Sequence, residues 1–140
     1  MDSSGGNGTK QMHNEMIAHF GFVPDFYATL PAPALPAAWA AHRDFELAET
    51  AIPNKYKELI GLAMAAHIKC RYCIYFHSQA ARAHGASEEE LKEACFMGGL
   101  TVQYSNALTG MRYDLEKFQH EVDRAVDFMT SQAITHQPTV

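Results

Sequence analysis

Residues 53–85 read PNKYKELIGLAMAAHIKCRYCIYFHSQAARAHG, and this stretch decides the fold class. Pro53 suits the first turn of a helix, where its missing N–H is no loss. Apolar residues then recur at the spacing of one buried helix face: Leu59, Leu62, Ala63 and Ala66. This helix is expected to run to about His67, and a second one is expected between Lys69 and Gly85, a typical C-terminal stop. If the chain folds back near Lys69, the two helices form an antiparallel hairpin.

The rest of the chain also reads as helix. Residues 11–30 predict a short helix, a turn and a second short apolar segment, and an Ala-rich helix is expected from about Pro36 to Thr50. Ser87-Glu88-Glu89-Glu90 has the form of a capping box that begins another helix. Residues 114–129 carry an apolar stripe typical of packing against the body or a partner subunit: Leu115, Phe118, Val122, Ala125 and Met129. No alternating strand pattern is present, so we predict an all-α fold.

Composition limits the remaining choices. The 140 residues, 47% hydrophobic and 19% charged, are enough for one globular domain. We expect a polar, Gly-rich flexible leader at residues 1–10 and a single helical domain at residues 11–140, with its motif core at residues 50–110. The formal net charge of −5, with no dense basic run, argues against nucleic acid as a partner. No stretch approaches the roughly 20 apolar residues that span a bilayer, and no signal peptide is recognisable. These features predict a cytoplasmic protein without a membrane partner.

A Cys-x-x-Cys pair stands at the start of the second hairpin helix. In a reducing compartment such a pair suits redox or metal chemistry better than a structural disulfide. Cys70 lies where one helix ends and Cys73 lies in the first turn of the next, where the helix dipole favours thiolate over thiol. His77 follows Cys73 by one turn on the same face and is suited to take or return a proton. Cys95 stands alone on an apolar helix face, so we expect it in the core.

Glu58 joins this group only through the hairpin. Twelve residues separate it from Cys70, but a chain that folds back near Lys69 brings its helix beside the helix of His77. A carboxylate there can orient the imidazole or pass a proton through water. Three aromatic side chains are expected in the core or in a subunit contact: Trp39, Phe45 and Tyr75.

Three other interpretations of the cysteine pair stay open. The two residues could be buried structural thiols that pack as small hydrophobic side chains. The pair also belongs to a set of four side chains that offer zinc ligands: His67, Cys70, Cys73 and His77. On one continuous helix those ten steps span about 15 Å, which is too long for one metal ion, although a break at Lys69 relaxes that objection. The pair could instead sense redox state without turnover, within a helical oligomer.

Glu58, Cys70-Arg71-Tyr72-Cys73 and His77 together match the pattern E-x11-C-x-x-C-x3-H. In this the chain resembles the alkylhydroperoxidase D-like proteins of the carboxymuconolactone decarboxylase superfamily, closely over residues 50–110. In the fullest form of the motif a histidine precedes the second cysteine, and here that position is Tyr72. The decarboxylase branch of the superfamily lacks the cysteine pair, so the resemblance does not imply lactone decarboxylation.

The resemblance implies an all-helical homotrimer or homohexamer that acts as an antioxidant oxidoreductase. Small hydroperoxides or partner disulfides are the substrates it implies, with both cysteines catalytic and with His77 and Glu58 as a proton relay. It implies no bound cofactor and no metal, an external thiol reductant such as dihydrolipoamide, and a lipoyl protein or a peroxiredoxin as partner. We expect Cys73 to attack peroxide, because His77 is adjacent, and Cys70 to resolve the product as a disulfide; a more exposed Cys70 at the helix start would reverse that order for disulfide exchange.

Overall fold

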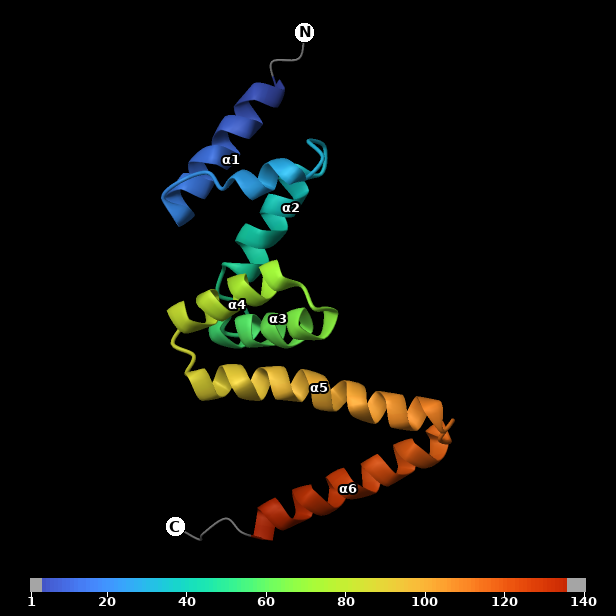
Figure 1. Ribbon diagram of the computed structural model, residues 1–140. Coiled ribbons are helices and arrows are strands. Elements are labelled where there is room, and N and C mark those ends of the chain that lie inside the picture. Colours follow the sequence, from blue (N-terminus) through green and yellow to red (C-terminus); the bar gives the residue numbers. More distant parts are fainter. Residues whose placement is uncertain (1–3, 136–140) are drawn as a thin grey trace.

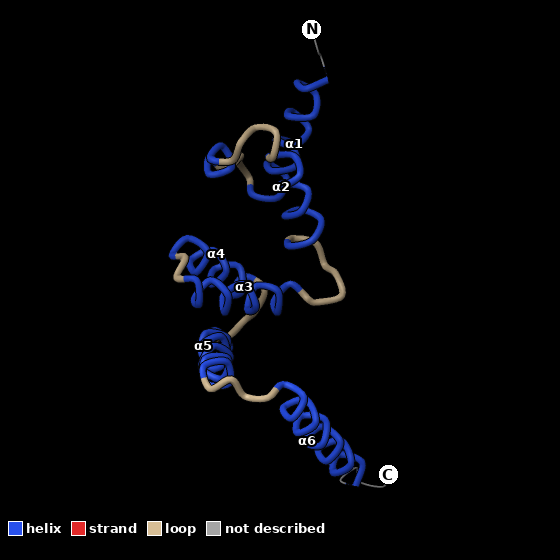
Figure 2. The backbone as a smooth tube through the Cα atoms, turned by 90° about the vertical axis from the view of Figure 1, so that its right-hand side faces the viewer, coloured by secondary structure: helices blue, strands red, loops and turns tan. Residues whose placement is uncertain are grey.

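The computed structural model describes the backbone of residues 4–135 and the side chains of residues 8–132, and within them it is helical with no strand (Figures 1 and 2). The elements follow in this order: α1 (Ser4–Phe20), the 3-10 helix η1 (Asp25–Thr29), α2 (Leu35–Ala41), the π-helix η2 (His42–Glu46), α3 (Asn54–Ile68), α4 (Arg71–Ala83), α5 (Glu88–Gly110) and α6 (Leu115–Thr135). The predicted all-α fold is confirmed.

The predicted turn near Lys69 closes the hairpin of α3 and α4. Lys69 adopts the left-handed conformation, with φ of 57°. Its N–H donates to the carbonyl of Ala66 at 3.3 Å, and the N–H of Cys70 donates to the carbonyl of Ala65 at 3.1 Å. These two bonds satisfy the last carbonyls of α3 in the pattern of a Schellman motif. The reversal therefore places Cys70 directly at the beginning of α4.

Two clusters of buried side chains form the core. The first joins α1, η1 and α2: Met12, Met16, Tyr27 and Trp39. The second joins the hairpin to α5: Leu62, Ala81 and Leu91. Trp39 is 2% exposed, so its expected place in the core is confirmed, whereas Phe45 and Tyr75 are exposed in the single chain.

The segment between α2 and α3 differs from the single Ala-rich helix that the sequence predicts. A π-turn replaces its second half, with the N–H of Leu47 donating to the carbonyl of His42 at 2.9 Å. Tertiary contacts hold this wide turn, because the Lys57 ammonium donates to the carbonyls of Phe45 and Ala48 at 2.6 and 2.5 Å. Side-chain donors from α3 thus satisfy carbonyls that an α-helix would have paired with its own backbone.

The N-terminal residues add one detail to the expected leader. Ser4–Lys10 belong to α1, and residues 1–3 lie outside the described part of the chain. The division into a leader and a single domain stays a prediction. No helix among the described residues is long and apolar enough to cross a membrane.

The long helix α5 begins with the predicted capping box. The Ser87 hydroxyl accepts from the N–H of Glu90 at 3.2 Å, and the Glu90 carboxylate accepts from the N–H of Ser87 at 2.8 Å. Beyond the hairpin, α5 continues outward and α6 turns back beneath it without packing on α3 or α4 (Figure 1). We call residues 96–135 the α5–α6 arm.

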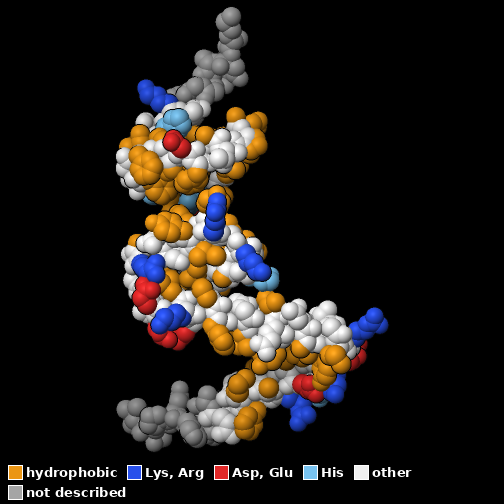
Figure 3. All heavy atoms as spheres, in the orientation of Figure 1, with side chains coloured by type: hydrophobic (Ala, Val, Ile, Leu, Met, Phe, Trp, Pro, Cys, Tyr) orange, Lys and Arg blue, Asp and Glu red, His pale blue; other side chains and the backbone are white. Residues whose placement is uncertain are grey.

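The expectation that Cys95 lies in the core is wrong for the single chain, where its side chain is exposed. The apolar residues around it on α5 suggested burial, but the packed face of this helix instead carries Leu91 and Gly98. Many orange side chains are also visible on the surface in Figure 3, some of them along the arm. Periodicity predicts an apolar face correctly without saying which other surface covers it.

Candidate active site

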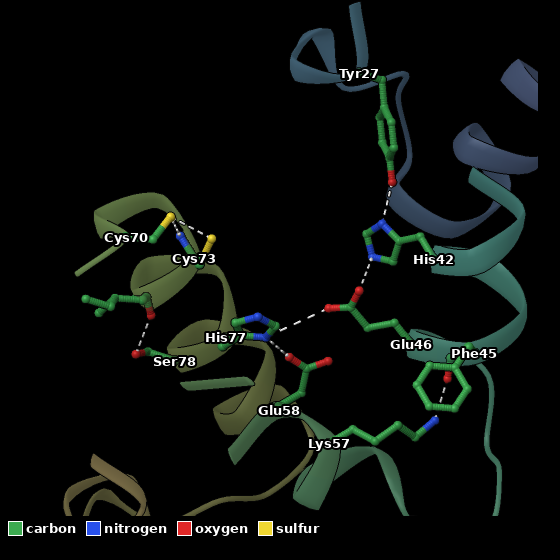
Figure 4. A network of polar contacts seen from close by, with 11 residues as sticks. Tyr27, His42, Phe45, Glu46, Lys57, Glu58, Cys70, Cys73, His77 and Ser78 are labelled. Atoms are coloured by element: carbon green, nitrogen blue, oxygen red, sulfur yellow. Dashed lines mark hydrogen bonds and ion pairs between the residues drawn. The ribbon is translucent and has the colours of Figure 1, made fainter. Parts of the chain in front are cut away.

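The two cysteines of the motif meet at the first turn of α4. Cys70 is the N-cap residue, in extended conformation, and its sulfur accepts from the backbone N–H of Cys73 at 3.4 Å. The two Sγ atoms lie 2.7 Å apart as free thiols, with both residues half-buried. Figure 4 shows them at one end of a line of polar side chains. The pair is therefore close enough to form a disulfide without rearrangement of the helix.

The pair is electrostatically asymmetric. The hydrogen bond from Cys73, followed by the bond from the Cys73 backbone N–H, lowers the pKa of the Cys70 thiol. The same contact with Cys70, followed by burial and by the charge on Cys70, raises the pKa of the Cys73 thiol. A thiolate at a helix N-terminus is stabilised by the unpaired N–H groups there. The first negative charge on the pair therefore lies on Cys70, and Cys73 keeps its proton.

The hairpin brings Glu58 to His77 as the sequence predicts. Nδ1 of His77 lies 2.7 Å from Oε2 of Glu58, whose residue is 1% exposed. The hydrogen bond to Glu58, and then the charges of Glu58 and Glu46, raise the pKa of His77 against the opposing effect of burial. Gly61 makes the approach feasible, because a Cβ atom there would lie 2.5–2.8 Å from the imidazole ring.

A second branch of the site was missed by the sequence analysis. Oε1 of Glu46 lies 3.8 Å from Nδ1 of His77, and Oε2 of Glu46 lies 3.8 Å from Nε2 of His42. Nδ1 of His42 is 2.5 Å from the hydroxyl of Tyr27, whose pKa is raised to about 12 by burial and by the charge of Glu46. His42 and Glu46 form an ordinary i, i+4 pair in the sequence, and no local signal says that they face the cysteine helix.

An open pocket of about 1010 Å³ lies over this branch and the cysteine helix. Cys73 is the cysteine that lines it, and His77, His42 and Glu46 also line it. Aromatic side chains supply much of the remaining wall: Phe26, Tyr72, Tyr75 and Phe76. The Tyr72 side chain is largely exposed, and its hydroxyl accepts from Arg71 at 3.0 Å. The pocket thus combines an apolar wall with a thiol and an imidazole.

Metal binding offers another use for the same side chains. Over the described residues, one group of three or more His, Cys, Asp and Glu side chains has ligand atoms close together: Glu46, Glu58 and His77, within 4.8 Å of one another. The four side chains considered for zinc in the sequence do not form such a group in the described part of the chain. Because the pKa of His77 is raised by its hydrogen bond to Glu58, we interpret the group as an acid–base cluster.

The comparisons with known proteins agree with this fold. Residues 33–115, more than half of the chain, match the carboxymuconolactone decarboxylase family. The chain belongs to that family. Its structure is similar to the crystal structure of the alkylhydroperoxidase AhpD core from Rhodospirillum rubrum, with a TM-score of 0.68 and 24% sequence identity over 85% of this chain and 93% of that chain. A search of curated proteins found no match.

Proposed function

We propose that this protein is a thiol-dependent peroxidase that reduces small organic hydroperoxides through Cys70 and Cys73. The observation that carries the proposal is the placement of Cys73 in an aromatic-walled pocket beside His77, with Cys70 at 2.7 Å and Glu58 behind the imidazole. A thiolate nucleophile, a proton carrier and a resolving thiol are the groups that two-electron reduction of a hydroperoxide needs.

The first chemical step oxidises Cys73. Neutral His77 takes the proton of the Cys73 thiol, and the resulting thiolate attacks the terminal oxygen of the hydroperoxide. The O–O bond breaks, Cys73 becomes a sulfenic acid, and the leaving alkoxide takes the proton from the His77 imidazolium to form the alcohol. Glu58 keeps the ring oriented and stabilises its transient positive charge.

The second step forms the disulfide. The Cys70 thiolate attacks the sulfur of the Cys73 sulfenic acid, and hydroxide leaves and takes a proton to become water. The two thiols have then given two electrons to the peroxide. An external dithiol such as dihydrolipoamide reduces the disulfide and is itself oxidised, and a lipoyl protein or a peroxiredoxin is the partner that would connect the cycle to metabolism.

The pKa directions give the sign of the pH dependence. His77 must be neutral to act as the base, and its pKa is raised by Glu58. Cys73 must lose its proton before attack, and its pKa is raised by Cys70. Both shifts leave the resting groups protonated to higher pH, so the rate of hydroperoxide attack should increase as pH rises through the neutral range.

Reduction of partner disulfides is a second candidate function, favoured by Cys70 itself. Its lowered pKa makes it the thiolate of the resting pair. For this reaction Cys70 would attack a disulfide sulfur and Cys73 would release the mixed disulfide. A Cys73→Ser variant that accumulates a mixed disulfide at Cys70 would support this route, and a variant that accumulates none would contradict it.

We also propose that the chain works as a homotrimer or homohexamer. The stripe on α6 is exposed in the single chain, and α6 does not pack on the hairpin. Burial of such a stripe against a second copy removes a large apolar area from water. Val122→Asp should lower the solution mass measured by light scattering, whereas His120→Asp, on the polar face, should not. An unchanged mass for Val122→Asp would contradict this use of the stripe.

Steady-state turnover tests the proposed function. Purified protein is mixed with an alkyl hydroperoxide and dihydrolipoamide, and peroxide loss is followed over a range of pH. The proposal predicts turnover that increases with pH and that is abolished in both Cys70→Ser and Cys73→Ser, while Cys95→Ser retains it. Wild-type rates in either motif variant would overturn the proposal. Reversible oxidation of the pair without turnover would instead favour the redox sensor.

A further inference from the structure

The imidazole of His77 has two carboxylate partners of different kinds. Glu58 approaches Nδ1 at 2.7 Å from the buried side, between the hairpin helices. Glu46 approaches the same nitrogen at 3.8 Å from the pocket side, and its side chain is 32% exposed. Figure 4 shows the Glu46 carboxylate between two imidazoles, those of His77 and His42. Glu46 therefore connects His77 to His42 and Tyr27 in the N-terminal part of the chain.

The turn that carries Glu46 is fixed by hydrogen bonds from α3 to its backbone, and the proposed catalytic steps do not use these bonds. Lys57, next to Glu58 on α3, is 9% exposed and donates to the carbonyls on either side of the end of η2. Asn54 of the same helix donates to the carbonyl of Leu47 at 3.0 Å. Because π-turns inside helical segments often occur at functional sites, a wide turn fixed in this way calls for a functional explanation.

His42 supports the far side of Glu46. Its Nδ1 is engaged by the Tyr27 hydroxyl at 2.5 Å, so the other ring nitrogen is directed toward Glu46. Nε2 of His42 is buried and has no hydrogen-bond partner. A displacement of about 1 Å would bring the Glu46 carboxylate to hydrogen-bond distance of either imidazole. Buried polar atoms are normally paired, so this unpaired nitrogen is available to the Glu46 carboxylate.

We propose that Glu46, on the turn fixed by Lys57 and between the rings of His42 and His77, is a positioning residue for His77, and that its carboxylate controls when this imidazole takes the proton of Cys73. The inference rests on the proposed function for its role in turnover, but the proton control itself is independent of any substrate. Glu46 also raises the pKa of Cys73 through its charge, so its removal acts on both groups in the same direction.

The ionisable groups that face this site come from several elements. They are Tyr27 of η1, His42 of η2, Glu58 of α3, and Arg71, Tyr72, Cys73, Tyr75 and His77 of α4. Because Glu46→Gln removes one charge and leaves this set intact, it is the sharpest variant. Exposed Glu49, on the same connecting segment, provides the matched control Glu49→Gln.

The experiment follows the titration of the His77 ring by NMR in the reduced protein, with the resonance identified by its absence in His77→Gln. A second readout is the pH dependence of alkylation at Cys73, which is separated from alkylation at Cys70 by peptide mass spectrometry. Glu46→Gln should weaken proton binding by His77 roughly fivefold and move the Cys73 alkylation profile to lower pH. Glu46→Asp, which keeps the charge, should recover most of the wild-type behaviour.

The outcomes separate this inference from the proposed function. Titration of His77 in Glu46→Gln that matches the Glu49→Gln control would overturn the inference. An NMR shift without a change in the Cys73 profile would overturn the control of Cys73. Both shifts together support the inference, even if the wild-type protein consumes no hydroperoxide. That last result would end the proposed function and leave the proton control in place.

Discussion

The α3–α4 hairpin and the α5–α6 arm are both built from amphipathic helices, yet they satisfy their apolar faces in different ways. The hairpin packs on the start of α5 around Leu62, Ala81 and Leu91. Each of its helices ends at a residue with positive φ, α3 at Lys69 and α4 at Gly85. The arm leaves large apolar side chains in solvent along both of its helices. The hairpin thus has one face packed on α5 and a second face that is exposed in the single chain, with Ile60, Met64 and Ile68 on it, whereas no side chain in the described part of the arm is buried. The difference teaches that the candidate site lies in the part of the chain that has a packed core of its own.

Polar side chains follow the same division. In the hairpin, Glu58 is buried and its carboxylate pairs with His77. In the arm, Glu121 is exposed and accepts from the Tyr113 hydroxyl at 2.8 Å. Solvent screens an exposed contact of this kind, so it contributes little to stability or to chemistry. Matched substitutions at the two carboxylates test the comparison most strongly.

The largest effect is expected from Glu58→Leu. The substitution removes the partner that orients His77, so hydroperoxide turnover should fall about 100-fold or more. The free energy of unfolding should also decrease, by about 3–5 kcal/mol at most, because removal of one partner of a buried pair leaves the other without its partner. Turnover and urea denaturation check these two outcomes, with Glu121→Gln as the control in the arm. Equal turnover in the two variants would refute the special role of the hairpin carboxylate.

Gly61→Ala should have the next largest effect. The added Cβ would lie 2.5–2.8 Å from ring atoms of His77, which forces the imidazole out of its place beside Glu58. We expect turnover to fall about tenfold or more, because a proton carrier must lie within reach of its partner. The perturbed His77 titration should be visible by NMR. Wild-type turnover and wild-type titration in this variant would show that the His77 ring can move away from the added Cβ without losing its contact with Glu58.

Gly98→Ala probes the contact between α5 and the hairpin. Its Cβ would lie 2.9 Å from the carbonyl oxygen of Ala63, and backbone atoms cannot move aside as a flexible side chain does. The free energy of unfolding should therefore decrease by about 1–3 kcal/mol, as measured by urea denaturation. The folded fraction should keep its cysteine chemistry, since the added Cβ meets the backbone of Ala63 and not the His77 ring. No loss of stability would mean that α5 can shift on α3 without cost.

The smallest expected effect is a gain in stability. Lys69 holds a positive φ that glycine adopts freely, as Gly85 does at the end of α4. Lys69→Gly should therefore raise the free energy of unfolding by about 0.5–1 kcal/mol and leave turnover unchanged. A decrease in stability would indicate that the Lys69 side chain makes a contact that outweighs its backbone strain.

Local patterns in the sequence predict the hairpin and its motif residues well. Pro53, Gly85 and the Ser87 capping box mark helix ends through short-range bonding, and the spacing from Cys70 to His77 follows from one helix face. Glu58 reaches His77 because a two-helix reversal has few geometries. These features depend on residues close in the sequence, so a single sequence contains the information.

The pocket side of the site could not be predicted in the same way. Glu46 faces His77 because Lys57 and Asn54 capture carbonyls of the connecting segment, and that capture is a tertiary event with no sequence period. The prediction that Cys95 is buried was wrong for a related reason. An apolar helix face predicts packing against another surface. Whether that surface belongs to the same chain depends on how the helices are arranged in three dimensions.

The most direct test of the central claim is a single turnover of Cys70→Ser with one equivalent of an alkyl hydroperoxide, followed by mass spectrometry after a sulfenic-acid trap. The account predicts the trapped sulfenic acid at Cys73, because this thiol lines the pocket beside His77 and has no resolving partner in the variant. The wild-type protein should instead give the Cys70–Cys73 disulfide. An unoxidised Cys73 in the variant would contradict the account.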